Sequence, residues 1–202
     1  MFLIKSLIFD VISYFVGTIS GAYLVGNKYL GTDIRNYGSG NAGSTNAIRV
    51  LGKKWGVITF VIDFLKGSLV AFIAKKVLQM NDFSIAIAIL FCVLGHDFPF
   101  YMNFKGGKGV ATTMGAFTVF NIKLTFIAWA TWMIVVLITK MASLGSILFF
   151  IVLAIMFTVS GLYSFNTLVV VYIIMLLGII KHRSNIIRII NGNENRIGQV
   201  KK

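Results

Sequence analysis

The sequence predicts an all-α membrane protein, a polytopic helix bundle with about seven membrane segments. Of its 202 residues, 57% are hydrophobic, 12% are charged and one is proline, and the mean hydropathy is +0.87. A soluble domain of this length exposes too much of its surface to hide that amount of apolar area. Long apolar runs with few charges are instead typical of membrane-spanning helices. We expect residues 1–202 to form a single integral membrane domain.

The apolar runs also place the individual segments. Helices are expected at 3–25, 55–78, 83–100, 109–120, 122–139, 142–159 and 163–181. The segment 109–120 is too short to cross about 30 Å of hydrocarbon at about 1.5 Å per residue, so we expect a half-span buried among its neighbours. The first segment lacks a small-residue cleavage site, and we expect it to be retained rather than removed as a signal peptide.

The net charge of +13 follows the connections between these segments. Most Lys and Arg residues fall in three connections that lie on one side of the membrane: 26–54, 101–108 and 181–202. The opposite connections, 79–82 and 160–162, contain no Lys or Arg. Because positive charge marks the cytoplasmic side, we expect the amino terminus outside and the carboxy terminus inside. Lys75, Lys76 and Lys123 oppose this trend, but each lies near a helix end and can snorkel.

Three glycine-rich polar segments lie on the same expected cytoplasmic side. They are "YGSGNAGSTNAIR" (37–49), "GHDFPFYMNFKGGKGVATT" (95–113) and "KHRSNIIRIINGNENRIG" (181–198). Glycines permit positive φ, so consecutive backbone N–H groups can form an anion-binding concavity, to which Ser, Thr and Asn add donors. Thr112 lies near the start of a short helix, whose N–H groups favour a phosphate. Together the segments predict a site for phosphorylated compounds, although each alone is also compatible with a turn or a lipid-headgroup contact.

Nucleotide and metal sites of the usual kinds are excluded. Gly38, Gly40 and Gly43 satisfy G-x-G-x-x-G, but no strand precedes them, and Asp63 lies in a membrane helix rather than a second strand. The "GGKG" sequence is followed by Val110 rather than Ser or Thr, so a P-loop is absent. The single cysteine excludes an intramolecular disulfide, and the loops contain no Cys/His/carboxylate cluster for a metal. We expect no cofactor, and the basic charge indicates anionic lipid rather than nucleic acid.

The motifs "GSGNAGSTN", "GHDFPFYMNFKGGKGVAT" and "HRSNIIRIINGNENRIG" carry a resemblance to a known family. With "DFLKG" (63–67) and "SLGS" (143–146), they are similar to the signature segments of the bacterial acyl-phosphate:glycerol-3-phosphate acyltransferase family (PlsY), over nearly the whole chain. Ser44 stands where the family usually has Ala, which is a small-for-small change. Lys140 stands where the family often has Arg, which affects only a preference for bidentate contact.

The resemblance implies a transferase of the bacterial inner membrane with its active site at the cytoplasmic face. Such an enzyme moves a fatty acyl group from acyl phosphate to the 1-hydroxyl of glycerol 3-phosphate. The products are 1-acyl-glycerol 3-phosphate (lysophosphatidate) and phosphate, in the first acylation step of phospholipid synthesis. The implied partners are these two substrates and membrane lipid. We expect a monomer.

The resemblance also implies site residues. Those that match its substrate- and phosphate-binding segments are Ser39, Gly40, Asn41, Thr45, Asn46, Arg49, Lys105, Gly106, Gly107, Lys108 and Thr112. Lys108 is the preferred phosphate anchor. His182 and Asn185 match the third segment and would face the reacting centre, with Ser143 nearby. Glu194 matches the acidic position of that segment and would order the basic loop.

Two features inside the apolar segments support the site or take part in it. Asp63 and Lys66 are three residues apart on one helix face, so they can pair, as a structural pair or wall of the cleft or in direct substrate contact. His96 stands at a helix end before the only proline of the chain, either as a catalytic base or as the residue that orients this turn.

For the mechanism, we expect direct transfer without an acyl-enzyme. An acyl phosphate is already activated, so positioning and electrostatics can supply most of the catalysis. A substrate phosphate oxygen is the expected proton acceptor, and His182 is the rival base. The competing classes are a transporter or flippase for phosphorylated compounds and a lipid-binding scaffold. An odd number of helices without an evident internal repeat disfavours the transporter.

The charge asymmetry generates a topology prediction. In a background where Cys92 is replaced, Ser44→Cys should be shielded from an impermeant thiol reagent in intact cells, and Asn81→Cys should be labelled. The measurement is the labelled fraction before and after the cells are permeabilised. The reverse pattern would contradict the predicted orientation.

Overall fold

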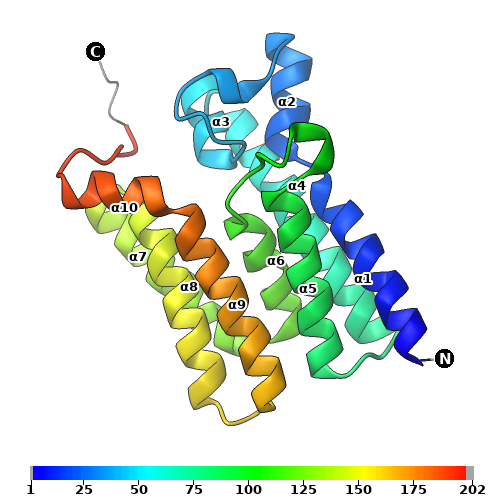
Figure 1. The fold of residues 1–202 in the computed structure, drawn as a ribbon. Helices are drawn as coiled ribbons and strands as arrows, with labels where there is room; N and C mark the ends of the chain where they lie inside the picture. Colours follow the sequence, from blue (N-terminus) through cyan, green and yellow to red (C-terminus); the bar gives the residue numbers. More distant parts are fainter. Residues whose placement is uncertain (1, 199–202) are drawn as a thin grey trace. The chain divides into compact units, whose positions relative to one another are not determined.

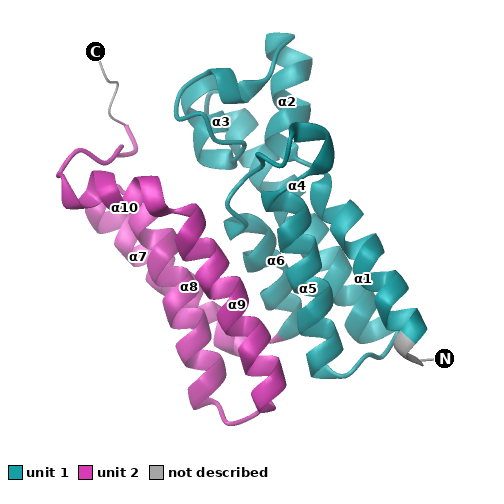
Figure 2. Ribbon diagram, in the orientation of Figure 1, with its two compact units in different colours: residues 1–120 teal, residues 121–202 magenta. Residues whose placement is uncertain are grey.

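The computed structural model describes residues 2–198, and their regular elements are all helical (Figure 1). Lys201 and Lys202 of the basic carboxy-terminal segment lie outside the described residues. The chain divides into two compact units, residues 1–120 and 121–202 (Figure 2). The expectation of a single domain over residues 1–202 stays a prediction.

Unit 1 contains long apolar helices joined by short helical turns. Its elements are α1 (Phe2–Thr18), α2 (Gly21–Leu30), η1 (Ile34–Asn36), α3 (Ser44–Leu51), α4 (Lys53–Phe72), η2 (Ile73–Val77), α5 (Asp82–Asp97), η3 (Phe100–Met102) and α6 (Val110–Phe120). Unit 2 contains α7 (Ile122–Thr139), α8 (Ala142–Val159), α9 (Phe165–Lys181) and α10 (Arg183–Ile190). The bounds of α7 and α8 coincide with the predicted segments.

Five helical stretches among the described residues are long and apolar enough to cross a membrane. They are Ile4–Leu30, Lys53–Val77, Asp82–Met102, Ile122–Thr139 and Ala142–Val159, and a sixth forms if α9 and α10, bent by 57°, count together. Helix α6 is apolar but has only 11 residues, in keeping with the predicted half-span. The all-helical class is thus confirmed, whereas the count of about seven and the orientation of the termini stay predictions.

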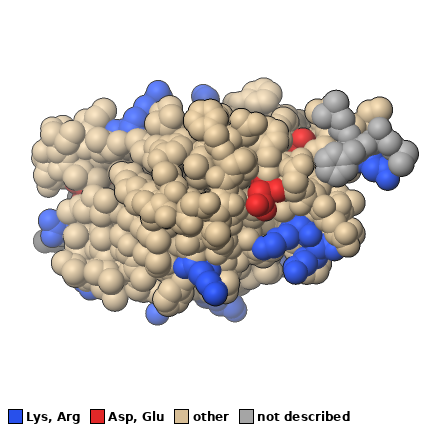
Figure 3. Space-filling model, turned by 90° about the horizontal axis from the view of Figure 1, so that it is seen from below, with Lys and Arg blue, Asp and Glu red and all other residues tan. Residues whose placement is uncertain are grey.

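Many large apolar side chains are exposed, as expected where lipid is the solvent. Ile138 is 76% exposed and Phe165 is 79% exposed, both in helices of unit 2. The face shown in Figure 3 is largely uncharged, and Lys and Arg are more prominent on it than Asp and Glu. A helix face can therefore be apolar because it meets lipid, and not only because it packs inside the protein.

The first predicted helix, 3–25, is wrong in one respect, because the structure interrupts it. Ile19 and Ser20 separate α1 from α2, and the Ser20 Oγ accepts a hydrogen bond from the Tyr23 backbone N–H at 3.3 Å as an N-cap. The connection predicted at 26–54 is also more helical than expected, because it contains the end of α2, η1 and α3. Similarly, α5 ends at Asp97 instead of continuing to residue 100.

Glycines set how closely the helices of unit 1 approach one another. A Cβ on Gly67 of α4 would collide with the Thr112 carbonyl of α6, and one on Gly115 of α6 would collide with the Phe64 carbonyl of α4. Small residues of this kind let membrane helices pack backbone to backbone. The short helix α6 is therefore held against α4 by direct backbone contact.

Lys75 has a defined structural role near the other end of α6. Its Nζ donates to the Val119 and Phe120 carbonyls at 3.1 and 2.7 Å, which are at the carboxy terminus of α6. The last carbonyls of a helix lack intrahelical partners, and a cation there is favourable. Lys75 therefore caps the carboxy terminus of α6, and its snorkelling stays a prediction.

The α4–α6 contact generates a stability prediction. Gly115→Ala places a methyl group against the Phe64 carbonyl, which is backbone and cannot rotate away. We expect a loss of about 1–3 kcal/mol, the usual cost of overpacking. Thermal unfolding in detergent measures it, and an unchanged midpoint would contradict the close contact.

Candidate functional site

The first glycine-rich segment is shaped by the side chain of Asn46. Its Oδ1 accepts from the Ser39 N–H at 2.8 Å, and its Nδ2 donates to the Tyr37 carbonyl at 3.0 Å. Gly38 has a φ of +63°, and a Cβ there would collide with the Asn46 Oδ1. Asn46 is buried and its amide is engaged by the backbone of this segment. The contacts show that it builds the loop; a direct contact with phosphate stays a prediction.

Other predicted residues of this segment lie at the surface. Ser39, Gly40, Thr45 and Arg49 are exposed, and Asn41 is half-buried. Their exposure leaves them accessible to a solute.

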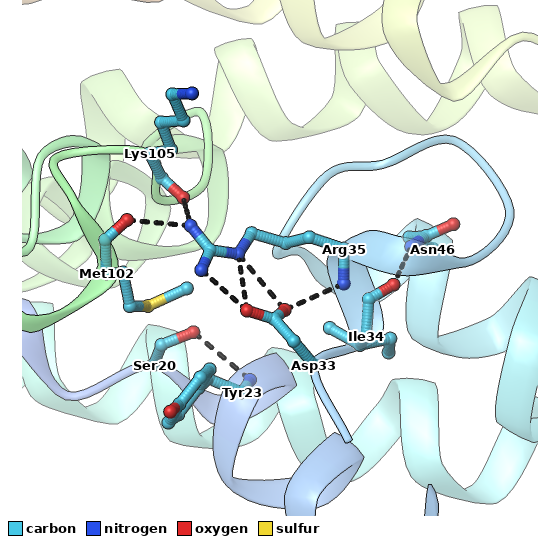
Figure 4. Close-up of polar contacts among 8 residues, drawn as sticks. All are labelled: Ser20, Tyr23, Asp33, Ile34, Arg35, Asn46, Met102 and Lys105. Carbon is cyan, nitrogen blue, oxygen red and sulfur yellow. Dashed lines mark hydrogen bonds and ion pairs between the residues drawn. The ribbon is translucent and has the colours of Figure 1, made fainter.

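Asp33 and Arg35 lie just before the first segment, and Arg35 binds the backbone of the second segment (Figure 4). The Arg35 guanidinium forms a bidentate ion pair with the Asp33 carboxylate, with Nη2 2.5 Å from Oδ2 and Nε 3.0 Å from Oδ1. Its Nη1 donates to the Met102 and Lys105 carbonyls, both at 2.7 Å. The hydrogen bond from Arg35 is the main cause that lowers the pKa of Asp33. One side chain therefore connects residues that are 67 and 70 positions away in sequence.

Sequence reasoning did not select Arg35 as a site residue. The available signal was Asp33, which is the only acidic residue in the segment 26–54 and lies two positions before Arg35. This pattern does not indicate the carbonyls of the second segment as further partners. The geometry adds Asp33 and Arg35 to the residues that position the candidate site.

The second segment folds back onto the end of α5. The N–H groups of Gly106 and Gly107 donate to the Asp97 and His96 carbonyls at 3.1 and 3.0 Å. A Cβ on Gly106 would collide with the His96 carbonyl, and one on Gly107 would collide with the His96 Nε2. The two glycines are thus required for close packing. The glycine pair lies between Lys105, whose side chain is exposed, and Lys108, whose side chain is half-buried.

A small core joins these two segments within unit 1. Its buried members come from α2, η1, the first segment, α3 and η3: Ala22, Ile34, Ala42, Ala47 and Met102. Alanine dominates the cluster, so the backbones of these elements lie close together. The structure therefore brings the first and second predicted segments together in one unit.

The predicted Asp63–Lys66 ion pair is present and buried in unit 1. The Lys66 Nζ lies 3.1 Å from the Asp63 Oδ1, and the two side chains are 4% and 2% exposed. Lys66 also donates to the Gly17 and Ile19 carbonyls at 2.8 and 2.5 Å. Asp63 accepts from the Gly21 N–H at 3.3 Å, so the pair holds both ends of the break between α1 and α2. Direct substrate contact by either residue has no support in these contacts.

Thr112 lies in the first turn of α6, as predicted, but it is fully buried. Its Oγ1 has no hydrogen-bond partner within the described part of the chain. The Thr112 carbonyl packs against Gly67 of α4. A phosphate contact by its side chain stays a prediction.

In unit 2, the Glu194 carboxylate accepts hydrogen bonds from three side chains. Its Oε1 accepts from the Ser143 hydroxyl at 2.9 Å and the Asn185 amide at 2.7 Å, and its Oε2 accepts from the Arg188 Nε at 2.8 Å. Burial raises the pKa of Glu194, but the bonds from Asn185, Ser143 and Arg188 outweigh it, so the net shift is downward. The structure thereby brings Ser143 of α8 and Asn185 of α10 to one anionic group.

His182 stands at the bend between α9 and α10. Its Nδ1 lies 2.7 Å from the Gly178 carbonyl, which can only accept, so the Nδ1 carries the proton. The chain continues as a helix after His182 but bends there by 57°, so α9 and α10 are not one straight helix. The Nδ1 of His182 contacts Gly178 and the Asn185 amide donates to Glu194, and the expectation that the two side chains face one reacting point stays a prediction.

The fold and these loops define a helical membrane protein with glycine- and lysine-rich segments of the kind that bind phosphorylated compounds. Within residues 2–198, no group of three or more His, Cys, Asp and Glu residues is placed to hold a metal ion.

The family model for glycerol-3-phosphate acyltransferase matches residues 7–192, and the chain belongs to this family. It is 43% identical to the glycerol-3-phosphate acyltransferase of Finegoldia magna, over 96% of each chain. It is 36% identical to that of Thermotoga petrophila, over 96% of this chain and 98% of the relative.

Two crystal structures of PlsY, an integral membrane glycerol 3-phosphate acyltransferase, resemble the chain. The glycerol 3-phosphate form has a TM-score of 0.90 at 38% identity, and the lysophosphatidic acid form has 0.87 at 36%, each over 96% of both chains.

The Asp33–Arg35 pair generates a pH-dependent prediction. Since the pKa of Asp33 is lowered in the folded state, the pair adds stability above the unfolded pKa of about 4, and this stability is lost as the pH falls through the folded pKa. A double-mutant cycle of Asp33→Asn and Arg35→Met should give a coupling of about 1 kcal/mol at pH 7. Thermal unfolding at pH 7 and at successively lower pH checks this, and a coupling that does not weaken in acid would contradict it.

Proposed function

We propose that this protein transfers a fatty acyl group from acyl phosphate to the 1-hydroxyl of glycerol 3-phosphate. The products are 1-acyl-glycerol 3-phosphate and phosphate, in the first acylation step of phospholipid synthesis. The protein acts as a monomer in the inner membrane, with its site on the cytoplasmic side, where the basic connections are expected.

One observation carries the proposal. The chain matches, over 96% of its length, crystal structures described as the glycerol 3-phosphate form and the lysophosphatidic acid form of an acyltransferase. These molecules are the acyl acceptor and the product of the proposed reaction. Acyl phosphate as the donor is supported by the signature segments that the chain shares with the acyl-phosphate-dependent family.

The phosphate groups of the substrates are assigned to unit 1. Ser39, Gly40, Asn41, Thr45 and Arg49 offer donors and charge on the first segment. Lys105, Gly106, Gly107 and Lys108 do so on the second, with Lys108 as the anchor. An ammonium group in contact with a phosphate is a charge-assisted interaction of the stronger class.

The proposed reaction is direct. The 1-hydroxyl oxygen attacks the acyl carbonyl carbon, and the bond from this carbon to the phosphate oxygen breaks. The hydroxyl proton passes to a phosphate oxygen of the acyl phosphate. This phosphate leaves as inorganic phosphate. The protein contributes orientation and stabilisation of the developing negative charge.

We assign His182, Asn185 and Ser143 to contact with the reacting group. Glu194 holds Asn185 and Ser143. With its proton on Nδ1, neutral His182 presents the Nε2 as a hydrogen-bond acceptor. We assign it a positioning hydrogen bond rather than the role of general base. Asn185 and Ser143 are held in place through the Glu194 carboxylate.

The assay follows phosphate release from purified protein in detergent. Release that requires both acyl phosphate and glycerol 3-phosphate is expected, and acyl-CoA should not replace the acyl phosphate. Comparable turnover with acyl-CoA would overturn the donor assignment. Uptake of phosphorylated compounds into reconstituted vesicles without phosphate release would show that the protein is a transporter rather than an enzyme.

Variants of the third segment test the proton assignment. His182→Gln should retain measurable activity, because glutamine offers a hydrogen-bonding group of similar reach, whereas His182→Ala and Asn185→Ala should lose most of it. A general base at this position would be worth about 10²–10⁴ in rate. The measurement is kcat for each variant across pH. A His182→Gln enzyme as inactive as His182→Ala, with a wild-type profile governed by a group near pH 6–7, would make His182 the base.

A further inference from the structure

We infer that Lys66 and His96 are positioning residues: Lys66 fixes His96 as a neutral imidazole with its proton on Nε2, and this fixed ring supports the loop that carries Lys105 and Lys108. The inference deepens the proposed function and rests on it for its kinetic part. It also removes His96 from the candidate bases.

The Lys66 ammonium lies among four acceptor atoms. The Gly17 and Ile19 carbonyls are 2.8 and 2.5 Å from its Nζ, the His96 Nδ1 is 2.8 Å away, and the Asp63 Oδ1 is 3.1 Å away. An ammonium group has three protons and no acceptor capacity. The side chain is 4% exposed, so protein atoms rather than water satisfy these donors.

This environment determines the protonation of His96. Because Lys66 can only donate, the Nδ1 of His96 at 2.8 Å must accept, and the single proton of the neutral ring is then on Nε2. A doubly protonated ring would turn an Nδ1–H toward the ammonium protons. The Asp63 Oδ1 is farther from the Nδ1, at 3.6 Å, so the shorter contact with Lys66 decides the assignment.

The other side of the imidazole faces the second segment. A Cβ on Gly107 would collide with the His96 Nε2, so the Gly107 backbone lies directly against the ring. The Gly107 N–H also donates to the His96 carbonyl at 3.0 Å. The position of the ring and the position of the loop are therefore coupled, with Lys108 one residue beyond the contact.

The same contacts argue against a base at His96. The Nδ1 lone pair is used by Lys66, and the Nε2 carries a proton, so the ring has no lone pair left to accept a substrate proton. His96 is 4% exposed and lies at the end of α5. Lys66 additionally joins this ring to the α1–α2 break, so the loop, α5 and α1 depend on one ammonium group.

Nitrogen-15 NMR of histidine-labelled protein tests the tautomer without reference to activity. The chain has only two histidines, so His182→Gln leaves His96 as the single signal. We expect a neutral ring with Nε2 protonated in this variant, and an additional Nδ1-protonated ring from His182 in the wild type. A His96 ring protonated on Nδ1, or on both nitrogens, at pH 7 would overturn the inference.

A matched pair of lysine variants tests the coupling to the loop. Lys75 donates to two carbonyls at the end of α6, as Lys66 does at the end of α1, but its hydrogen-bond partners in the described part of the chain do not include a histidine. Lys66→Met should lower kcat/KM by about 10- to 100-fold, as expected for a misplaced binding loop. Lys75→Met should lower the unfolding midpoint but change kcat/KM less than about twofold.

Equal effects of the two lysine variants on kcat/KM would overturn the coupling of Lys66 to the loop. If Lys66→Met does not fold, the NMR result on the His182→Gln protein still decides the tautomer. A wild-type protein without transferase activity would contradict the proposed function and leave the NMR test unaffected, so the two failures are distinguishable.

Discussion

The buried ammonium of Lys66 holds the point at which the first membrane helix breaks, and much of unit 1 depends on this interaction. Unpaired backbone groups cost about 1–3 kcal/mol each when buried, and lipid offers them no replacement partners. Three successive carbonyls at the break, those of Gly17, Thr18 and Ile19, accept from the side chains of Lys66 and Tyr101. Asp63 accepts from Gly21 on the other side of the break. The backbone groups at the break are thus hydrogen-bonded. The break can therefore place α2 and the first polar segment next to the end of α5.

The same solution recurs at other helix ends, and it explains why rigid loops can exist beside the membrane helices. Lys75 caps α6, His182 caps α9, and the glycine N–H groups of the second segment cap α5. Arg35, which lies in η1 just before the first segment, then binds the second segment through two carbonyls. A phosphate site built from loops gains affinity when these loops are ordered before the ligand arrives. Structural charges at Lys66, Arg35 and Glu194 therefore order the segments that carry the proposed site residues without having to touch a ligand themselves.

Local sequence patterns predicted part of this arrangement well. Composition was sufficient for the membrane class, and helices α7 and α8 were placed correctly because polar or small residues mark their starts after long apolar runs. The Asp63–Lys66 pair followed from its spacing. The break after Thr18 was missed because Ile19 continues the apolar pattern, and its cause lies about 45 residues away in α4. Likewise, the Met102 and Lys105 carbonyls bound by Arg35 and the Ser143 hydroxyl bound by Glu194 are distant in sequence, and no local periodicity indicates them.

Hydrogen–deuterium exchange of the wild-type protein in detergent tests the central claim that the helix breaks and polar loops are held by these contacts. The informative amides are those of Gly21, Gly106 and Gly107, each of which donates to a defined acceptor. The account predicts slow exchange for all three, approaching that of the α4 and α5 interiors. Exchange as fast as that of an exposed loop would show that these amides are not held, and it would contradict the account.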